Sequence, residues 1–198
     1  MYAAFLTEIA SHGYLVVAPG PPNQRFNGST TAVFQMESIN YAGNWKSAPF
    51  KPDVSNVAVG GHSCGGRESI LNAASNLQRG IKTVLILNSS GPEESFRSIT
   101  APVLIINGGE EDVAVPTSDE NFQFIVDEVP RLQAFKAVLE TGHLGSFWSV
   151  SRGGIYAETV VHWLDWQLKG ASWAKTWFAG GEESPAALRG WTTASNGI

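Results

Sequence analysis

Short runs of β-branched and other apolar residues alternate along the chain with longer segments in which apolar residues recur at every third or fourth position. The first pattern is typical of buried strands, and the second of helices that pack along one side. Strands are predicted at residues 14–18, 54–59, 83–87, 103–106 and 132–139. Helices are predicted to end before Gly13 and to span about residues 31–44, 65–79, 116–129 and 154–169. This alternation predicts a three-layer α/β/α sandwich built on a mostly parallel sheet.

The last part of the chain has little periodic pattern. Residues 171–198 hold three of the seven tryptophans but no regular spacing of apolar positions. The chain contains no internal repeat and no stretch that resembles an interdomain linker. We therefore expect a single domain over residues 1–198, with a core of about residues 2–170 and a Trp-containing C-terminal tail.

Composition narrows the class of protein. The 198 residues are 43% hydrophobic and 16% charged, which supplies enough apolar material for a folded core. The net charge is −5 without a basic stripe, so no nucleic-acid partner is expected. The apolar runs are too short for a membrane span, and the single cysteine excludes an internal disulfide. The oligomeric state stays open, and so does the compartment: cytoplasmic, or secreted if a signal lies upstream of Met1.

The sharpest motif is Gly61-His62-Ser63-Cys64-Gly65, a G-x-S-x-G pattern between a predicted strand and a predicted helix. A tight turn at this place lifts a serine hydroxyl clear of the backbone, and we expect it to require glycine at both Gly61 and Gly65. Because the chain holds 21 glycines, the motif alone also fits a glycine-rich turn without chemistry. The strand-to-helix context favours a nucleophile.

A serine hydroxyl needs a base to remove its proton, and histidine is the usual one. His12 lies at a helix end, where a structural role is expected. His162 lies on the polar face of the last helix, where a solvated surface role is expected. His62 is part of the motif itself and is expected to line the site rather than act as its base. His143 lies in a glycine-containing loop directly after a predicted strand, so it is the candidate base.

A carboxylate is expected to orient the histidine and to stabilise its protonated form. Glu110, Glu111 and Asp112 follow the strand predicted at residues 103–106. Asp112 is the candidate, since its short side chain holds a fixed distance, and the two glutamates are interpreted as turn or rim residues. A solvated acidic turn is the alternative. A bound cation is a further one, although the spacing does not form a calcium loop.

The chain order Ser63, Asp112, His143 places each candidate after a predicted strand and resembles the α/β-hydrolase superfamily. The resemblance covers about residues 2–170. Its motifs are the helix-to-strand segment at residues 11–19, the nucleophile elbow at 57–66, the acid loop at 101–116 and the histidine loop at 142–143.

Within the superfamily, the chain is most similar to lidless serine esterases of the dienelactone-hydrolase-like, chlorophyllase-like and cutinase-like or polyester-hydrolase-like types. Only about a dozen residues lie between the strands that end near Asn88 and begin near Pro102, too few for a helical cap. Dienelactone hydrolases proper carry cysteine where this chain has Ser63. That difference favours an ordinary serine esterase.

The resemblance is incomplete at the N-terminus. Family members have three strands before the first helix, and a loop after the third that supplies one oxyanion donor. Here the backbone N–H of Cys64 is the oxyanion donor that the resemblance implies. Without the third strand, the strands at residues 14–18 and 54–59 are expected to pair directly or to leave backbone groups open. The chain is accordingly expected to be a fragment of a longer hydrolase.

The expected reaction is two-step acyl transfer from a small-molecule or polymeric ester, without metal or organic cofactor. The expected substrate-binding residues are His62, Asn88, Phe147 and Trp148, from their places at strand ends and in the histidine loop. Phe147 and Trp148 fit positions in the core equally well. Two alternatives stay open. One is a non-catalytic hydrolase domain that serves as a binding or structural module, and the other is a peptidase or acyltransferase on the same fold.

Overall fold

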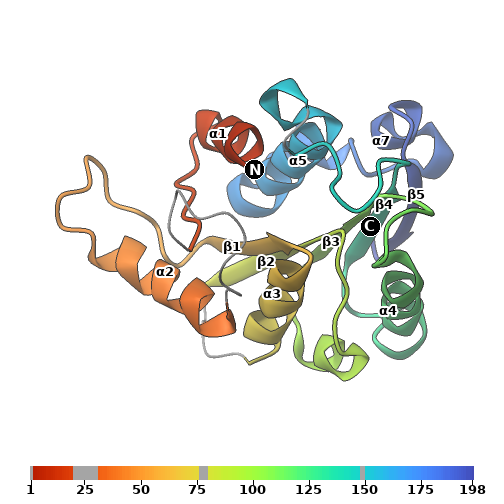
Figure 1. Ribbon diagram of the computed structural model, residues 1–198, viewed down its shortest axis with the longest axis horizontal. Coiled ribbons are helices and arrows are strands. Elements are labelled where there is room, and N and C mark those ends of the chain that lie inside the picture. The colour runs from red at the N-terminus through yellow and green to blue at the C-terminus, as the bar shows by residue number, and fades with distance from the viewer. Residues whose placement is uncertain (1, 20–30, 76–79, 148–149) are drawn as a thin grey trace.

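The computed structural model describes residues 2–19, 31–75, 80–147 and 150–198, which contain one five-stranded sheet (Figure 1). The strands follow one another across the sheet in chain order. They are β1 (Val57–His62), β2 (Ile81–Leu87), β3 (Val103–Asn107), β4 (Ala134–Val138) and β5 (Thr192–Asn196). The first four are parallel, and β5 is antiparallel to β4. The carboxyl ends of the parallel strands therefore meet at one edge of the sheet, where sites usually form.

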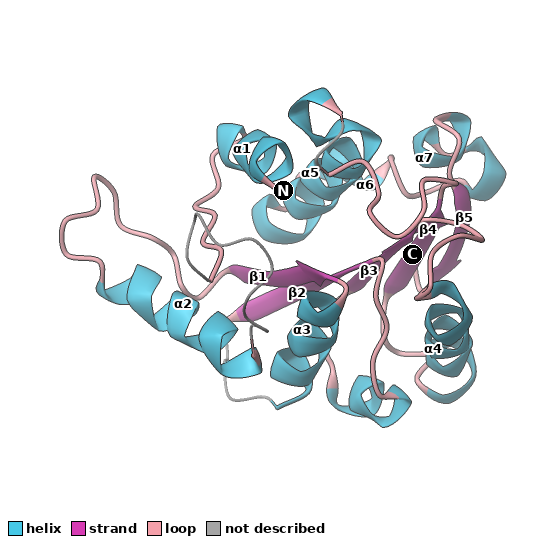
Figure 2. Cartoon of the chain, viewed as in Figure 1, coloured by secondary structure: helices cyan, strands magenta, loops and turns pink. Residues whose placement is uncertain are grey.

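Helices cover both faces of the sheet, as Figure 2 shows. One face carries α1 (Ala3–Ser11), α5 (Gly154–Lys169), α6 (Ser172–Lys175) and α7 (Pro185–Leu188). The other carries α2 (Ala32–Asn44), α3 (Cys64–Ser75) and α4 (Val115–Glu128). Three 3₁₀ helices span Glu93–Ser98, Ser151–Gly153 and Gly181–Glu183. The predicted three-layer sandwich is confirmed, and the four predicted helix starts lie within one residue of those observed.

Two apolar clusters hold the three layers together, one on each face of the sheet. The alternation along β2 divides its side chains between them: Leu85 and Leu87 belong to the cluster under α5, and Val84 and Ile86 to the cluster under α3. All of β3 is buried, because helices cover both of its faces. The buried central strands thus give rigid support to the loops that follow their carboxyl ends.

The strand predicted at residues 14–18 is not formed, and that prediction is wrong. Leu15 and Val17 are 37% and 39% exposed, while Tyr14 and Val16 pack against the cluster under α5. A β-branched segment becomes a strand only where its backbone groups pair with a neighbour. Among the described strands, β1 pairs only with β2, so the segment at residues 14–18 lies outside the sheet.

The C-terminal tail is part of the sheet and of its core. Its strand β5 pairs with β4, and the side chains of Trp177, Phe178 and Trp191 are buried in the cluster under α5. The indole N–H of Trp191 donates to Thr159 Oγ1 on α5 at 3.0 Å. Residues beyond 170 therefore contribute buried side chains to the same core as the segment that the sequence pattern assigned to it.

Polar contacts fasten α1 and the residues after it to α5. The Tyr14 hydroxyl donates to Asp165 at 2.6 Å, and Lys169 pairs with the same carboxylate at 2.7 Å. The Glu8 carboxylate of α1 also accepts two hydrogen bonds, each of 2.7 Å, from an arginine of the 3₁₀ helix Ser151–Gly153 that directly precedes α5. Because Tyr2 directly precedes α1, these contacts also fix the position of its backbone. Among the helices that the structure describes, none has the length and apolar character to cross a bilayer.

Candidate active site

Ser63 occupies a sharp turn between β1 and α3. Its φ angle is 55°, a left-handed conformation that non-glycine residues seldom adopt. The turn is fixed on both sides, since the Ser63 N–H donates to the Leu87 carbonyl at 3.1 Å and the Gly66 N–H donates to the Ser63 carbonyl at 3.0 Å. Strain of this kind at the end of a strand is typical of a nucleophile elbow.

Close packing explains two of the three glycines around this turn. A Cβ on Gly61 would lie 2.3 Å from the carbonyl carbon of Gly65, and a Cβ on Gly66 would lie 2.5 Å from Ser89 Cβ. A Cβ on Gly65 would meet no atom within 4 Å. The expected need for glycine therefore holds at Gly61 and is wrong at Gly65. It applies at Gly66, which the sequence analysis did not single out.

Replacing Gly61 with alanine should lower the free energy of unfolding by about 1–3 kcal/mol, the usual cost of forcing extra atoms into a packed region. Gly65→Ala is the matched control, because it adds the same methyl group to the same turn in open space. At that position in α3, alanine is also the better helix former. Urea unfolding of both variants measures the difference, and equal stability of the two would contradict the packing argument.

Asp112 lies in the turn after β3, with only 1% of its surface exposed. Its carboxylate accepts from the Gly108 N–H at 2.9 Å and from the Ala114 N–H at 3.1 Å. Burial acts to raise the pKa of the Asp112 carboxyl, but the hydrogen bonds from Gly108, His143 and Ala114 outweigh it and hold the pKa below its usual range. The site therefore contains a buried, ionised carboxylate in a fixed orientation.

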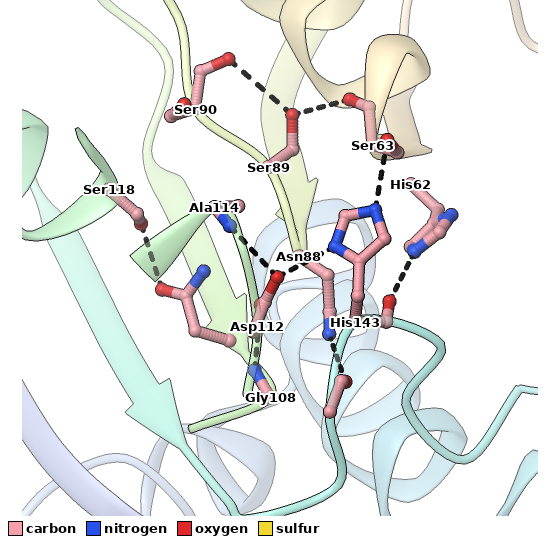
Figure 3. Close-up of polar contacts among 12 residues, drawn as sticks. His62, Ser63, Asn88, Ser89, Ser90, Gly108, Asp112, Ala114, Ser118 and His143 are labelled. Carbon is pink, nitrogen blue, oxygen red and sulfur yellow. Dashed lines mark hydrogen bonds and ion pairs between the residues drawn. The ribbon is translucent and has the colours of Figure 1, made fainter. Parts of the chain in front are cut away.

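His143 connects this carboxylate to the serine. Its Nδ1 lies 2.7 Å from Asp112 Oδ1, and its Nε2 lies 3.1 Å from Ser63 Oγ (Figure 3). An ionised carboxylate can only accept, so Nδ1 carries the proton and Nε2 is free to accept from the serine hydroxyl. The structure thus brings together the three residues that the sequence analysis grouped, each from the loop after a different strand. The arrangement allows the Ser63 proton to move to His143 as the serine oxygen attacks.

Backbone contacts hold the loop that carries His143. The N–H groups of the two residues before His143 both donate to the Gly108 carbonyl, at 3.0 and 2.8 Å. The Gly142 carbonyl accepts from Asn88 Nδ2 at 2.9 Å, and the His143 carbonyl accepts from His62 Nε2 at 2.6 Å. The position of the imidazole therefore depends on two side chains that do not touch Ser63 Oγ.

The structure corrects two of the expected substrate-binding residues. Asn88 is fully buried and takes a φ of 47° to reach the histidine loop. Phe147 is 1% exposed and lies in the cluster under α5. Both support the site from beneath rather than line it, because the loops that carry them fold inward at this edge. His62 is half-buried with both ring nitrogens engaged. Trp148 lies outside the described residues.

The remaining candidate acids and histidines take no part in the contacts that join Ser63, His143 and Asp112. Glu110 and Glu111 are exposed beside the buried Asp112, and His12 is exposed at the end of α1. His162 is not a solvated surface residue as expected. Its ring stacks on Trp177 with centroids 4.2 Å apart, because the C-terminal tail covers that face of α5.

Some of the residues that support the site were not predicted from the sequence. Asn121, buried in α4, accepts from the Gly91 N–H at 2.9 Å and donates to the Gly91 carbonyl at 3.0 Å. On the same loop, Ser89 donates to the Ser63 carbonyl. The sequence did contain a pattern that indicates the role of Asn121. It precedes Ile125 by one helical turn and so lies on the buried side of α4, where an amide without a hydrogen-bond partner would be costly. Tyr2, which contacts His62, had no such signal.

Comparison with known proteins agrees with this geometry. The sequence model of the alpha/beta hydrolase family matches residues 1–132 of the 198, and the chain belongs to that family. The matched segment contains Ser63 and Asp112 and ends before His143. A search of curated proteins found no significant match. Family membership supports a hydrolase-type function, to which the geometry adds the chemistry proposed below.

Proposed function

We propose that the protein is a serine hydrolase that cleaves carboxylic ester bonds, with Ser63 as nucleophile, His143 as general base and Asp112 as the residue that orients the base. The observation that carries the proposal is the unbroken chain of contacts from Asp112 Oδ1 through the His143 ring to Ser63 Oγ, at 2.7 and 3.1 Å. The strained backbone of Ser63 and the buried carboxylate of Asp112 support the same roles.

In the first half of the reaction, Ser63 Oγ attacks the ester carbonyl while His143 Nε2 takes the hydroxyl proton. A tetrahedral intermediate forms, and the histidine becomes an imidazolium ion that Asp112 stabilises. Nε2 then gives the proton to the departing alcohol oxygen as the ester bond breaks. The acyl group remains on Ser63.

In the second half, water replaces the alcohol. His143 Nε2 takes a proton from the water as its oxygen attacks the acyl carbonyl, and it returns that proton to Ser63 Oγ when the acid leaves. The enzyme ends in the state in which it began. These steps need neither a metal nor an organic cofactor.

The N–H of Cys64 is the proposed donor to the oxyanion. Cys64 is the first residue of α3, and its N–H has no acceptor among the residues that the structure describes. The positive end of the α3 dipole lies at the same place. A backbone donor aimed at the developing negative charge typically contributes about 10²–10³ to the rate.

The surroundings of the reacting groups favour apolar esters with bulky or polymeric parts. Between β2 and β3, the helical structure is limited to the 3₁₀ helix Glu93–Ser98, so no helical cap is inserted there. Val113 and Leu144, which directly follow Asp112 and His143, are 81% and 42% exposed. These features support the lidless type of esterase, including the dienelactone-hydrolase-like, chlorophyllase-like and cutinase-like members.

Two assays on the purified chain test the proposal. We expect hydrolysis of p-nitrophenyl esters, and stoichiometric labelling by a fluorophosphonate that mass spectrometry locates on Ser63, because only an activated serine reacts with it. Labelling together with cleavage of peptides but not esters would indicate a peptidase on the same nucleophile. A folded protein that takes no label would reject the nucleophile and favour a binding or structural module.

A further inference from the structure

We propose that His62 is a positioning residue for His143, acting on the main-chain carbonyl of His143 and held in place by the Tyr2 hydroxyl. The inference rests on the proposed function, in which the His143 ring has to stay within reach of Ser63. His62 directly precedes Ser63 in the chain, so one peptide unit links the nucleophile to the group that holds its base.

Hydrogen bonding fixes the tautomer of His62. Its Nε2 lies 2.6 Å from the His143 carbonyl oxygen, which can only accept, so Nε2 carries the proton. Its Nδ1 lies 2.7 Å from the Tyr2 hydroxyl and accepts the hydroxyl proton. A neutral ring satisfies both contacts at once. The His143 carbonyl therefore sets the tautomer, and the Tyr2 hydroxyl, which can donate or accept, donates to the remaining ring nitrogen and holds the ring in place.

Packing keeps the His62 ring from turning away. The ring centroid lies 4.8 Å from that of His143, 5.2 Å from that of Phe147 and 5.7 Å from that of Tyr2. Phe147 is itself fully enclosed, with edge-to-face contacts to Phe5 and to a tyrosine of α5. The buried position of Phe147 thus has a consequence for the site, since it forms one wall of the His62 ring.

The contact of His62 complements that of Asn88. Asn88 Nδ2 holds the Gly142 carbonyl, and His62 Nε2 holds the next carbonyl in the chain. The two donors come from the ends of adjacent strands, β2 and β1. With both carbonyls held, the peptide planes on either side of the His143 Cα are fixed, which sets the direction of its Cα–Cβ bond. The bond from Nδ1 to Asp112 then orients the ring.

The charge state of His62 fits this role. Burial lowers the pKa of the His62 imidazole more than its hydrogen bond to the His143 carbonyl and the charge of Asp112 raise it. A neutral His62 matters because His143 becomes positively charged during the reaction. A second positive ring at this distance would oppose that step.

Two substitutions at His62 separate positioning from substrate contact. The side-chain amide nitrogen of glutamine reaches about as far as histidine Nε2, whereas that of asparagine reaches only about as far as Nδ1. We expect His62→Asn to lower kcat by about 10²-fold with little change in KM, as for a small misplacement of a catalytic group. His62→Gln should recover most of that loss. Tyr2→Phe should give a smaller loss, because the His62 ring keeps its packing and its bond to the His143 carbonyl but loses the hydrogen bond from the Tyr2 hydroxyl.

Three results would overturn the proposal: a wild-type kcat for His62→Asn, an effect confined to KM, or a glutamine variant no better than the asparagine variant when both are folded. Circular dichroism and urea unfolding establish whether they are folded. A selective rise in KM would make His62 a substrate contact instead.

A spectroscopic readout separates this inference from the proposed function. Nitrogen-15 chemical shifts should show His62 as the neutral tautomer protonated at Nε2 and should show the His143 ring shifted in His62→Asn but restored in His62→Gln. Unchanged His143 signals in the asparagine variant would overturn the positioning role, whatever the activity. If the shifts behave as expected but the wild-type chain shows no hydrolysis that depends on Ser63, the proposed function fails and the positioning contact stands.

Discussion

Replacing Ser63 with alanine is expected to lower ester hydrolysis by about 10⁶-fold, the effect typical of removing the nucleophile from a serine hydrolase. The lost atom is Oγ, whose described hydrogen bond is the one with His143. The contacts that hold the turn use the Ser63 backbone and remain. Alanine at a φ of 55° is strained as serine is, so stability should change little.

Initial rates with a p-nitrophenyl ester measure this effect, and Ser90→Ala is the matched control. Ser90 is a partly exposed serine on the loop after β2, two residues past Asn88, and its substitution should leave the rate near that of the wild type. Residual activity of Ser63→Ala above a hundredth of the wild-type rate, from folded protein, would mean that another group carries the reaction.

Asp112→Asn is expected to lower kcat by about 10⁴-fold while leaving substrate binding almost intact. An asparagine amide can donate to His143 Nδ1, which favours the tautomer with its proton on Nε2. That nitrogen could then no longer accept the proton of Ser63. Glu111→Gln removes a negative charge from the neighbouring exposed residue and should change kcat by less than about threefold, in line with the small effect of surface charges. Equal losses in both variants would contradict the choice of Asp112.

The same variant should change the response to acid. Because the pKa of Asp112 in the folded protein lies below its ordinary value, the ionised carboxylate stabilises the fold above about pH 4. That contribution is lost as the pH falls through the folded pKa. Thermal unfolding between pH 7 and pH 3 should therefore show a smaller loss of stability for Asp112→Asn than for the wild type. An equal loss would show that the carboxylate is not preferentially ionised in the folded state.

Much of the fold and the main candidates could be predicted from the sequence because both depend on local patterns and on parallel-sheet geometry. Residues that follow parallel strands meet at one edge, which is why Ser63, Asp112 and His143 could be grouped before any distance was known. The pairing of strands, in contrast, depends on residues far apart in the sequence. The segment at residues 14–18 has a strand-like sequence but stays outside the sheet, because no neighbouring strand pairs with it. The same holds for β5, whose sequence TTASN has little strand character and pairs because the tail brings it to β4.

The residues that support the site could not be predicted from the sequence, for a different reason. Asn88 directly follows β2 and Phe147 follows His143 by four positions, and the sequence alone could not tell whether they face the substrate or the interior. The contact between Tyr2 and His62 joins residues 60 positions apart and depends on how α1 is fastened to α5. Contacts of this kind follow from tertiary packing, for which hydrophobic periodicity carries no information.

Backbone groups anchor the histidine loop together with the side chains of Thr141 and His143, and this has a consequence for redesign. The backbone groups are the N–H groups before His143 and the carbonyls of Gly142 and His143. The side chain of Leu144 takes no part in them and is 42% exposed. Under the proposed function, we therefore expect that substitutions at Leu144 change substrate preference and leave the contacts among Ser63, His143 and Asp112 in place. We expect libraries that randomise Leu144 together with the exposed Val113 to yield variants with altered ester preference and an unchanged triad geometry.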